Sequence, residues 1–396
     1  LLVLLITVHL AVLALFKYAG FAARSVNALV PDLLPVFAPA LPLGISFYIF
    51  TAIGYLADVA NGKVKAARSP FRFFVFLAFF GHGPSGPIVR YYQQLPYLDA
   101  KAAERQVSLD RFCYGIKRLV LGLAKKALIA DQLALIYARV TSVPAATLPA
   151  PALVLGYLAY MMQLYFDFSG YSDMAIGIGS FFGLELPENF DYPYLARSIG
   201  EYWRRWHISL SGWFRDYVYI PLGGSRCSLA KNCRNLVIVF LLTGLWHGAA
   251  WQYVAFGLLH GVLLCAERLG MRTLLDRAPR LLAHLYTVGV LWFTLIIFGA
   301  HGLAEGLAAW KGILTWQSGA RGYTLAAFAD TKLLLLLAAS MLLCGPVQAW
   351  FPRLKTALYA KTTPGPAGMA GLLVLLFFSL MRVTAGTYSA FIYFQF

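Results

Sequence analysis

An all-α, polytopic integral membrane protein is the architecture that this 396-residue sequence favours, for reasons of composition. Hydrophobic residues make up 60% of the chain and charged residues only 13%, about half of the roughly 25% typical of soluble domains. The mean hydropathy is +0.67. So few charges cannot cover a water-facing surface. The composition therefore excludes a soluble enzyme, a disordered protein and a disulfide-rich secreted module.

Apolar runs locate the membrane spans, since a spanning helix needs about 20 apolar residues. The runs that qualify as spans or half-spans are 1–16, 41–60, 70–90, 116–138, 150–167, 168–186, 235–264, 281–300, 332–351 and 367–390. The stretch 187–234 is more polar and predicts irregular structure. We find no tandem repeat or low-complexity tract, so we expect one membrane-embedded domain over 1–396. The chain opens inside an apolar run without an initiator Met, and we expect residues ahead of Leu1.

The net charge of +16 predicts sidedness rather than a nucleic-acid partner. Basic residues gather in short loops at 61–69, 225–234, 266–280 and 352–361, which predicts that these loops are cytoplasmic. The uncharged loop 141–149 predicts the opposite side. Because the basic residues form no continuous stripe, membrane lipid is the expected environment and nucleic acid is not expected to bind.

A basic face is predicted within 111–126, where Arg111, Arg118 and Lys125 stand seven residues apart. A helix that crossed the bilayer with these cations would bury them at large cost. The spacing therefore predicts an amphipathic helix that lies along the cytoplasmic interface.

The apolar run 235–264 has basic loops on both sides, so the chain should enter the membrane and return. Two full spans would need about 40 residues. We therefore expect a re-entrant or bent pair of short helices, broken near Gly244 or Gly248. The alternative is one long tilted helix.

Ionisable residues inside apolar runs are the candidates for function. His247 lies in the middle of 235–264, beside glycines that would let a ligand approach the backbone. His207 lies in a Trp- and Arg-rich segment typical of a membrane interface. His82 lies in a Gly/Pro-rich stretch that could be a further re-entrant turn, and His260 is interpreted as a packing residue.

Asp167 and Asp173 flank a short polar stretch between two apolar runs. They either pair with arginines inside the bundle or line a polar path. The chain has no H-E-x-x-H, Walker A or G-x-S-x-G motif. Its five cysteines form no C-x-x-C pair, so no metal site is expected. A membrane-embedded histidine without a nucleophilic Ser or Cys nearby suits general-base chemistry, for which a low-dielectric site keeps the ring neutral.

Four segments together resemble the membrane-bound O-acyltransferase (MBOAT) family. They are 165–177 (YFDFSGYSDMAIG), 187–190 (PENF), 203–224 (WRRWHISLSGWFRDYVYIPLGG) and 244–251 (GLWHGAAW). The likeness covers about residues 41–265 and is closest to the alginate O-acetyltransferase branch, near the branch that transfers D-alanine. Several long motifs in the right order are far more specific than a short pattern.

The resemblance implies a ring of transmembrane helices with short or re-entrant helices around a central tunnel. It implies that His247 is the catalytic histidine, that His207 is the second signature histidine, and that no cofactor is bound permanently. It implies an acyl-CoA donor entering from the cytoplasm, here acetyl-CoA. The expected donor- or substrate-binding residues are Trp203, Arg204, Arg205, Trp206, Arg215, Asp216, Trp246, Asp167 and Asp173.

We interpret the chain as a multi-pass enzyme of a bacterial cytoplasmic (inner) membrane that acetylates an exported polysaccharide. Transfer is direct or passes through a periplasmic or surface partner acyltransferase of the SGNH type, alongside the polysaccharide biosynthesis machinery. His247 would act as general base, and His207 would position the acyl group or stabilise the developing charge. The alternatives are D-alanyl-type transfer from a carrier protein, and a proton-coupled transporter or polysaccharide-export channel that uses the same Asp and His residues.

Overall fold

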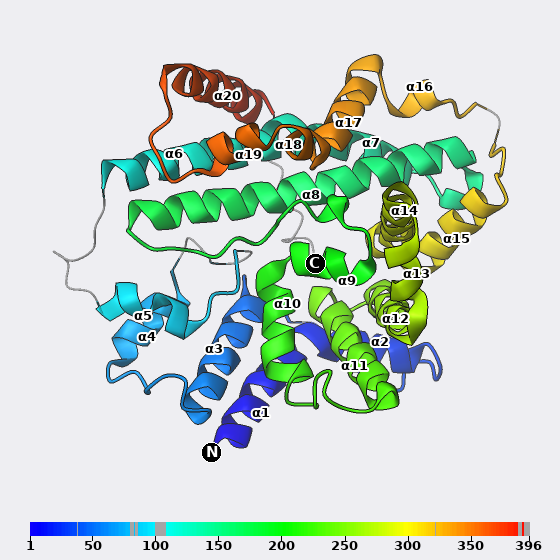
Figure 1. Cartoon of the computed structure of the whole chain (residues 1–396). Helices are drawn as coiled ribbons and strands as arrows, with labels where there is room; N and C mark the ends of the chain where they lie inside the picture. The colour runs from blue at the N-terminus through cyan, green and yellow to red at the C-terminus, as the bar shows by residue number, and fades with distance from the viewer. Residues whose placement is uncertain are drawn as a thin grey trace.

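The protein is helical throughout the part of the chain that the computed structural model describes, which comprises residues 1–37, 39–79, 83, 86–99, 108–320, 322–386 and 390–391. The all-α class is confirmed, and Figure 1 shows the arrangement. The helices are α1 (Leu2–Leu13), α2 (Ala19–Asn27), α3 (Ile45–Ala60), α4 (Pro70–Leu77), α5 (Tyr91–Asp99), α6 (Leu109–Ala124), α7 (Asp131–Thr141), α8 (Ala150–Phe181), α9 (Ile199–Arg205), α10 (Ile208–Phe214), α11 (Leu229–His247), α12 (Trp251–Ala266), α13 (Arg272–Arg277), α14 (Arg280–Gly299), α15 (Leu303–Leu314), α16 (Leu325–Phe328), α17 (Thr331–Leu343), α18 (Pro346–Trp350), α19 (Pro352–Tyr359) and α20 (Pro366–Ala385).

Several helices are long and apolar enough to cross a membrane, which supports the multi-pass architecture. Among the described residues they are Leu2–Asn27, Leu229–His247, Trp251–Arg277, Arg280–Gly299 and Pro366–Ala385. The helices Ile45–Ala60 and Thr331–Leu343 are apolar but shorter. The predicted span 70–90 is wrong as a single helix, because α4 ends at Leu77. His82 lies outside the described residues.

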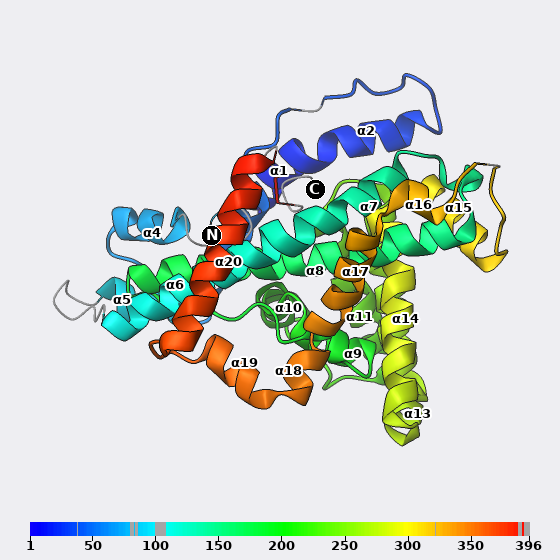
Figure 2. The same ribbon diagram turned by 90° about the horizontal axis from the view of Figure 1, so that it is seen from above.

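The two spans predicted at 150–167 and 168–186 are one helix, α8, of 32 residues. It runs beside α6 and α7 in both views (Figures 1 and 2). Glycines permit this close packing: a Cβ on Gly122 would lie 2.4 Å from the Gly170 carbonyl oxygen, and one on Gly177 would lie 2.6 Å from that of Gly115. The polar stretch between the two runs therefore stays helical because α6 covers it.

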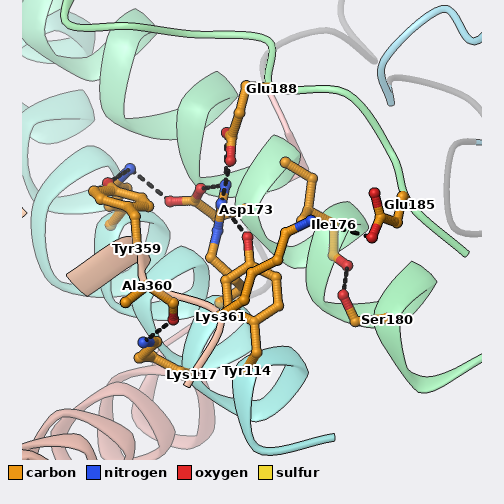
Figure 3. Close-up of polar contacts among 12 residues, drawn as sticks. Tyr114, Lys117, Asp173, Ile176, Ser180, Glu185, Glu188, Tyr359, Ala360 and Lys361 are labelled. Atoms are coloured by element: carbon orange, nitrogen blue, oxygen red, sulfur yellow. Dashed lines mark hydrogen bonds and ion pairs between the residues drawn. The ribbon is translucent and has the colours of Figure 1, made fainter. Parts of the chain in front are cut away.

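The basic surface helix predicted at 111–126 is wrong in its orientation. Lys117, Arg118 and Lys126 are buried, and their side chains face the protein. Figure 3 shows Asp173 of α8, together with Glu188 and Tyr114, turned toward a common centre, where the Arg118 guanidinium binds all three. Seven-residue spacing locates a face on a helix, but it does not tell whether that face meets water or carboxylates on a neighbouring helix.

The run 235–264 forms a helical hairpin, and the single long helix is excluded. The chain breaks after His247, at Gly248–Ala250, close to the predicted position. A Cβ on Gly244 would lie 2.2 Å from the Tyr253 carbonyl oxygen, so glycine is required where α11 meets α12. The two helices are longer than predicted, because α11 already begins at Leu229 and the helical run from Trp251 continues to Arg277. Each is therefore long enough to cross the membrane, rather than a short re-entrant segment.

The stretch 187–234, predicted as irregular, contains the short helices α9 and α10. Figure 2 shows α10 near the centre of the molecule, with the long helices around it. This matches the expectation of short helices inside a set of long ones. The tunnel implied by the resemblance stays a prediction.

Candidate active site

His207 stands between α9 and α10 at the centre of the fold. Its backbone is in the left-handed region, with φ of 44°, a conformation that residues other than glycine rarely adopt. Its Nδ1 lies 3.2 Å from Oδ1 of Asn189, and its ring centroid lies 4.7 Å from that of Phe168 on α8. His207 lies outside the candidate spanning helices. Complete burial lowers its pKa well below the usual value, and the nearby His247 lowers the pKa further, so the ring is neutral.

His247 is the last residue of α11 and is buried among aromatic rings. The ring centroids of Trp246 and Phe298 lie 5.2 Å and 5.1 Å from its own. Trp246 also lies 5.6 Å from the ring of His207. The structure therefore brings the two predicted histidines, 40 positions apart in the sequence, against the same indole ring.

The glycine beside His247 does not leave room for a ligand, contrary to the expectation. A Cβ on Gly248 would lie 2.2 Å from Cε2 of Tyr253, so the phenol ring already fills this space. Gly248 and Gly244 serve the close packing of the hairpin. The apolar and aromatic walls around His247 exclude water instead, which strengthens electrostatic interactions at the site.

The end of α11 is held by the N-terminal helical segment. Lys17 donates to the Trp246 carbonyl oxygen at 2.5 Å, and the Tyr18 hydroxyl donates to that of Leu245 at 2.8 Å. These carbonyl groups end a helix, where a cation is favoured. The segment thus fixes the backbone that presents His247.

A cavity of about 580 Å³ opens beside the histidines. It is lined by Ile208, the residue after His207, and by Thr243, one helical turn before His247. Neither histidine is itself among the lining residues. Four arginines outnumber two carboxylates in its wall: Arg90, Arg204, Arg215 and Arg268 against Glu188 and Asp216, with Trp203 among the aromatic lining residues. The cavity thus has the positive charge that phosphate groups need.

Four predicted donor-binding residues line this cavity: Trp203, Arg204, Arg215 and Asp216. The Arg215 side chain is 65% exposed, and its Nε lies 2.8 Å from Asp216. Asp216 also lies 2.9 Å from the buried Arg90. Arg204 has no ion pair within the described ranges. The same holds for Arg268 within those ranges, so Arg204 and Arg268 are the lining cations best placed to meet a ligand.

The other predicted binding residues lie elsewhere. Arg205 does not line the cavity, and it forms ion pairs with Glu201 and Asp191 at 2.9 Å and 3.3 Å. Trp206 is buried and stacks on Tyr202, with 5.6 Å between ring centroids. The contacts that are resolved favour a structural role for both.

Asp167 and Asp173 pair with basic residues of the α6–α7 segment. Lys126 lies 2.6 Å from Asp167, and Lys125 lies 2.6 Å from Asp173, which also binds Arg118. Of the two interpretations that the sequence left open, the structure shows pairing inside the bundle, with lysines as well as an arginine. Asp173 additionally lines a second cavity of about 320 Å³.

Three residues at the site escaped the sequence analysis. Lys17 is a lone cation at the edge of the first apolar run, and Arg90 ends the run 70–90. An isolated cation at such a position is the signal that could have identified both. Asn189 belongs to a motif that was noticed, but no sequence pattern indicates that its amide meets His207.

Comparison with known proteins follows this geometry. Residues 61–309 match the sequence model of the membrane-bound O-acyltransferase family, and they include both histidines, Trp246 and most of the cavity wall. The chain belongs to the membrane-bound O-acyltransferase family. It is therefore an O-acyltransferase, and the transporter interpretation is not favoured.

Several bacterial proteins are similar to this chain over 56–99% of its length. It is 37% identical to the "Probable alginate O-acetylase AlgI" of Azotobacter vinelandii, over 99% of this chain and 84% of that protein. It is 36% identical to the "Peptidoglycan O-acetyltransferase" of Helicobacter pylori, over 79% and 64%. It is 33% identical to the "Teichoic acid D-alanyltransferase" of Bacillus subtilis, over 56% and 58%. The likeness to O-acetylating MBOAT proteins thus extends over more of the chain than the likeness to this D-alanyltransferase.

Proposed function

We propose that this protein transfers an acetyl group from a cytoplasmic CoA thioester to a hydroxyl group that serves an exported polysaccharide. The observation that carries the proposal is the pair His207 and His247, which both contact the ring of Trp246, beside a cavity lined by arginines. The similarity to polysaccharide O-acetylating relatives supports the acetyl group and the class of acceptor. We propose a bacterial inner membrane location, which the same likeness supports.

The chemistry requires a base and a leaving group. The acceptor oxygen attacks the carbonyl carbon of the thioester, the new C–O bond forms, and the C–S bond breaks. The hydroxyl proton passes to His247 as general base and then to the departing CoA sulfur. Burial among aromatic rings suits a neutral imidazole in this role.

The acceptor proposed for this step is a hydroxyl group at the outer face, on the polysaccharide itself or on a partner acyltransferase of the SGNH type. Basic residues gather in the predicted cytoplasmic loops, whereas the loop 141–149 has no charge, so we assign this loop to the outer face. The cavity arginines Arg204, Arg215 and Arg268 lie next to predicted cytoplasmic loops, which supports entry of the donor from the other side.

A reconstitution assay tests this function. The purified chain in nanodiscs should transfer label from [¹⁴C]acetyl-CoA to alginate or to an added SGNH partner. Unlabelled acetyl-CoA should compete, whereas a D-alanyl carrier protein should not. Label transfer only from the carrier protein would overturn the acetyl-CoA proposal.

Charge reversal at Arg204 should weaken donor binding more than it slows the chemical step. Arg204 lines the cavity and has no ion pair to compensate among the resolved contacts. A hydrogen bond to a charged group contributes about 1.5–3 kcal/mol. The KM for acetyl-CoA of Arg204→Glu should therefore rise about 10- to 100-fold, with kcat within about threefold.

Arg277→Glu provides the matched control for this variant. Arg277 is exposed on α13, on a predicted cytoplasmic loop, and does not line the cavity. Its KM should stay at the parental value. An unchanged KM with a collapsed kcat for Arg204→Glu would show that Arg204 does not hold the donor.

A further inference from the structure

Asn189 faces Nδ1 of the His207 ring, and the orientation of its amide is determined by its neighbours. The atom of Asn189 that faces Nδ1 of His207 also lies 3.0 Å from the backbone nitrogen of Ser209. A backbone N–H can only donate, so this atom must be the amide oxygen. The amide flip that often leaves Asn ambiguous is thereby excluded.

The Ser209 hydroxyl supports the same assignment. Its Oγ accepts a hydrogen bond from the Ile88 backbone nitrogen at 3.0 Å, which leaves its own hydrogen free to donate. That hydrogen points to Oδ1 of Asn189, 2.9 Å away. Two donors thus already meet one oxygen, and this oxygen can offer only an acceptor to His207.

The tautomer of His207 follows from this arrangement. Because the group facing Nδ1 is an acceptor, Nδ1 must carry the hydrogen. In the neutral ring, Nε2 then carries a lone pair and cannot donate. The burial that lowers the pKa of His207 keeps the ring in this neutral form.

The backbone holds this contact rigidly. The Ile208 backbone nitrogen donates to the Asn189 carbonyl oxygen at 3.0 Å, so the two segments are joined by main chain as well as by side chains. Both Asn189 and His207 are 0% exposed. The left-handed backbone of His207 is strained and persists only where the surroundings impose it.

We propose that Asn189 is a positioning residue that holds His207 as the Nδ1–H tautomer, so that Nε2 is a hydrogen-bond acceptor during acyl transfer, while the hydroxyl proton itself passes to His247. This inference rests on the proposed function. It replaces the expectation that a neutral His207 stabilises developing negative charge, because a lone pair at Nε2 would repel an oxyanion. His207 can thus accept a hydrogen bond at Nε2 from a bound substrate, and His247 is the neighbouring titratable group.

Nitrogen NMR tests the tautomer without any assay of activity. The chain has seven histidines, so ring-¹⁵N-labelled protein gives few signals, and His207→Ala identifies the one of interest. We expect a protonated Nδ1 and an unprotonated Nε2 in the parent protein. The opposite tautomer would overturn the inference and leave the proposed function intact.

The kinetics of Asn189 variants test whether the tautomer of His207 matters for acyl transfer. Asn189→Ala removes the oxygen that accepts from Nδ1 of His207. When a metal-bound histidine loses the corresponding hydrogen-bond partner, metal affinity or activity falls about 10- to 100-fold. We expect a fall of that size in kcat with little change in the KM for acetyl-CoA. Asn27→Ala is the control. It removes two hydrogen bonds between the Asn27 side-chain amide and the Leu34 backbone, outside the site, and should keep the parental kcat.

The variant Asn189→Asp distinguishes a role of Asn189 in positioning His207 from a purely structural role. The carboxylate still accepts from Nδ1, so activity should recover at high pH. Its negative charge raises the pKa of His207, so the ring becomes protonated at a higher pH than in the parent. The titratable group that otherwise faces His207 is His247 of α11, while α8 contributes the uncharged Phe168.

The acidic limb of the kcat profile should therefore move upward in Asn189→Asp. A profile that matches the parent, or an Asn189→Ala variant with parental kcat, would overturn the inference. A parent protein that transfers no acetyl group at all would instead refute the proposed function, and the tautomer measured by NMR would still stand.

Discussion

His247→Ala should lose acetyl transfer almost completely while the protein still inserts and purifies. General-base assistance contributes about 10²- to 10⁴-fold to a rate. No serine or cysteine motif in the chain offers a second nucleophile. The rate of transfer by purified variants, in matched amounts, measures the effect directly. We expect a fall of at least about 10²-fold in kcat.

The packing around His247 requires a second variant. Its ring lies against Trp246, Phe256 and Phe298, so alanine leaves a cavity as well as removing the base. His247→Gln fills more of that volume and equally lacks a base, and it should be as inactive as the alanine variant. His301→Ala, at an exposed histidine, is the control and should keep parental activity. An active His247→Gln enzyme would remove His247 from the mechanism.

The composition and motif order were sufficient to predict the class of fold, the family and the hairpin near Gly248. These features depend on which residue types follow one another along the chain. A chain with 60% apolar residues favours a membrane, and a 30-residue apolar run between basic loops favours a return, although one long tilted helix stayed an alternative until the structure excluded it. Both are local properties, so a single sequence contains them.

The errors have a different physical origin. Arg118 faces inward because Asp173 and Glu188 lie opposite, and these carboxylates follow it by 55 and 70 positions. Lys17 reaches the end of α11, 229 positions away. Periodicity within one helix cannot reveal such partners, since they come from packing between distant segments. The same reason hid the contact between Asn189 and His207.

The Arg118 cluster ties these distant segments together, and its loss should strongly destabilise the protein. The guanidinium binds Asp173 on α8 and Glu188 in the following loop, and it stacks 5.0 Å from the ring centroid of Tyr359 near the C-terminus. Removing one partner of a buried pair costs about 3–5 kcal/mol. Asp173 would keep Lys125 at 2.6 Å and Glu188 is 53% exposed, so we expect a loss toward the lower end of that range. Arg118→Met should therefore lower the thermal unfolding midpoint of the detergent-purified protein markedly.

Arg111→Met is the matched control on the same helix. Arg111 pairs with Glu185 at 2.9 Å, but the two side chains are 32% and 44% exposed, and such a pair contributes about 1 kcal/mol or less. The Arg118 variant should therefore lose far more stability than the Arg111 variant. Equal shifts of the midpoint would contradict a buried anchor at Arg118.

The activities of the Arg118 and Arg111 variants should follow the same order as their stabilities, because the Arg118 ion pair restrains a loop that leads to His207. Glu188 immediately precedes Asn189, so the ion pair with Arg118 restrains the loop whose next residue binds His207. At temperatures well below its midpoint, Arg118→Met should show a reduced kcat, whereas Arg111→Met should keep the parental value. Arg118→Lys retains the charge but loses the forked geometry that binds both carboxylates, and it should rescue little. Full activity in a folded Arg118→Met protein would show that this loop needs no anchor to hold the histidine.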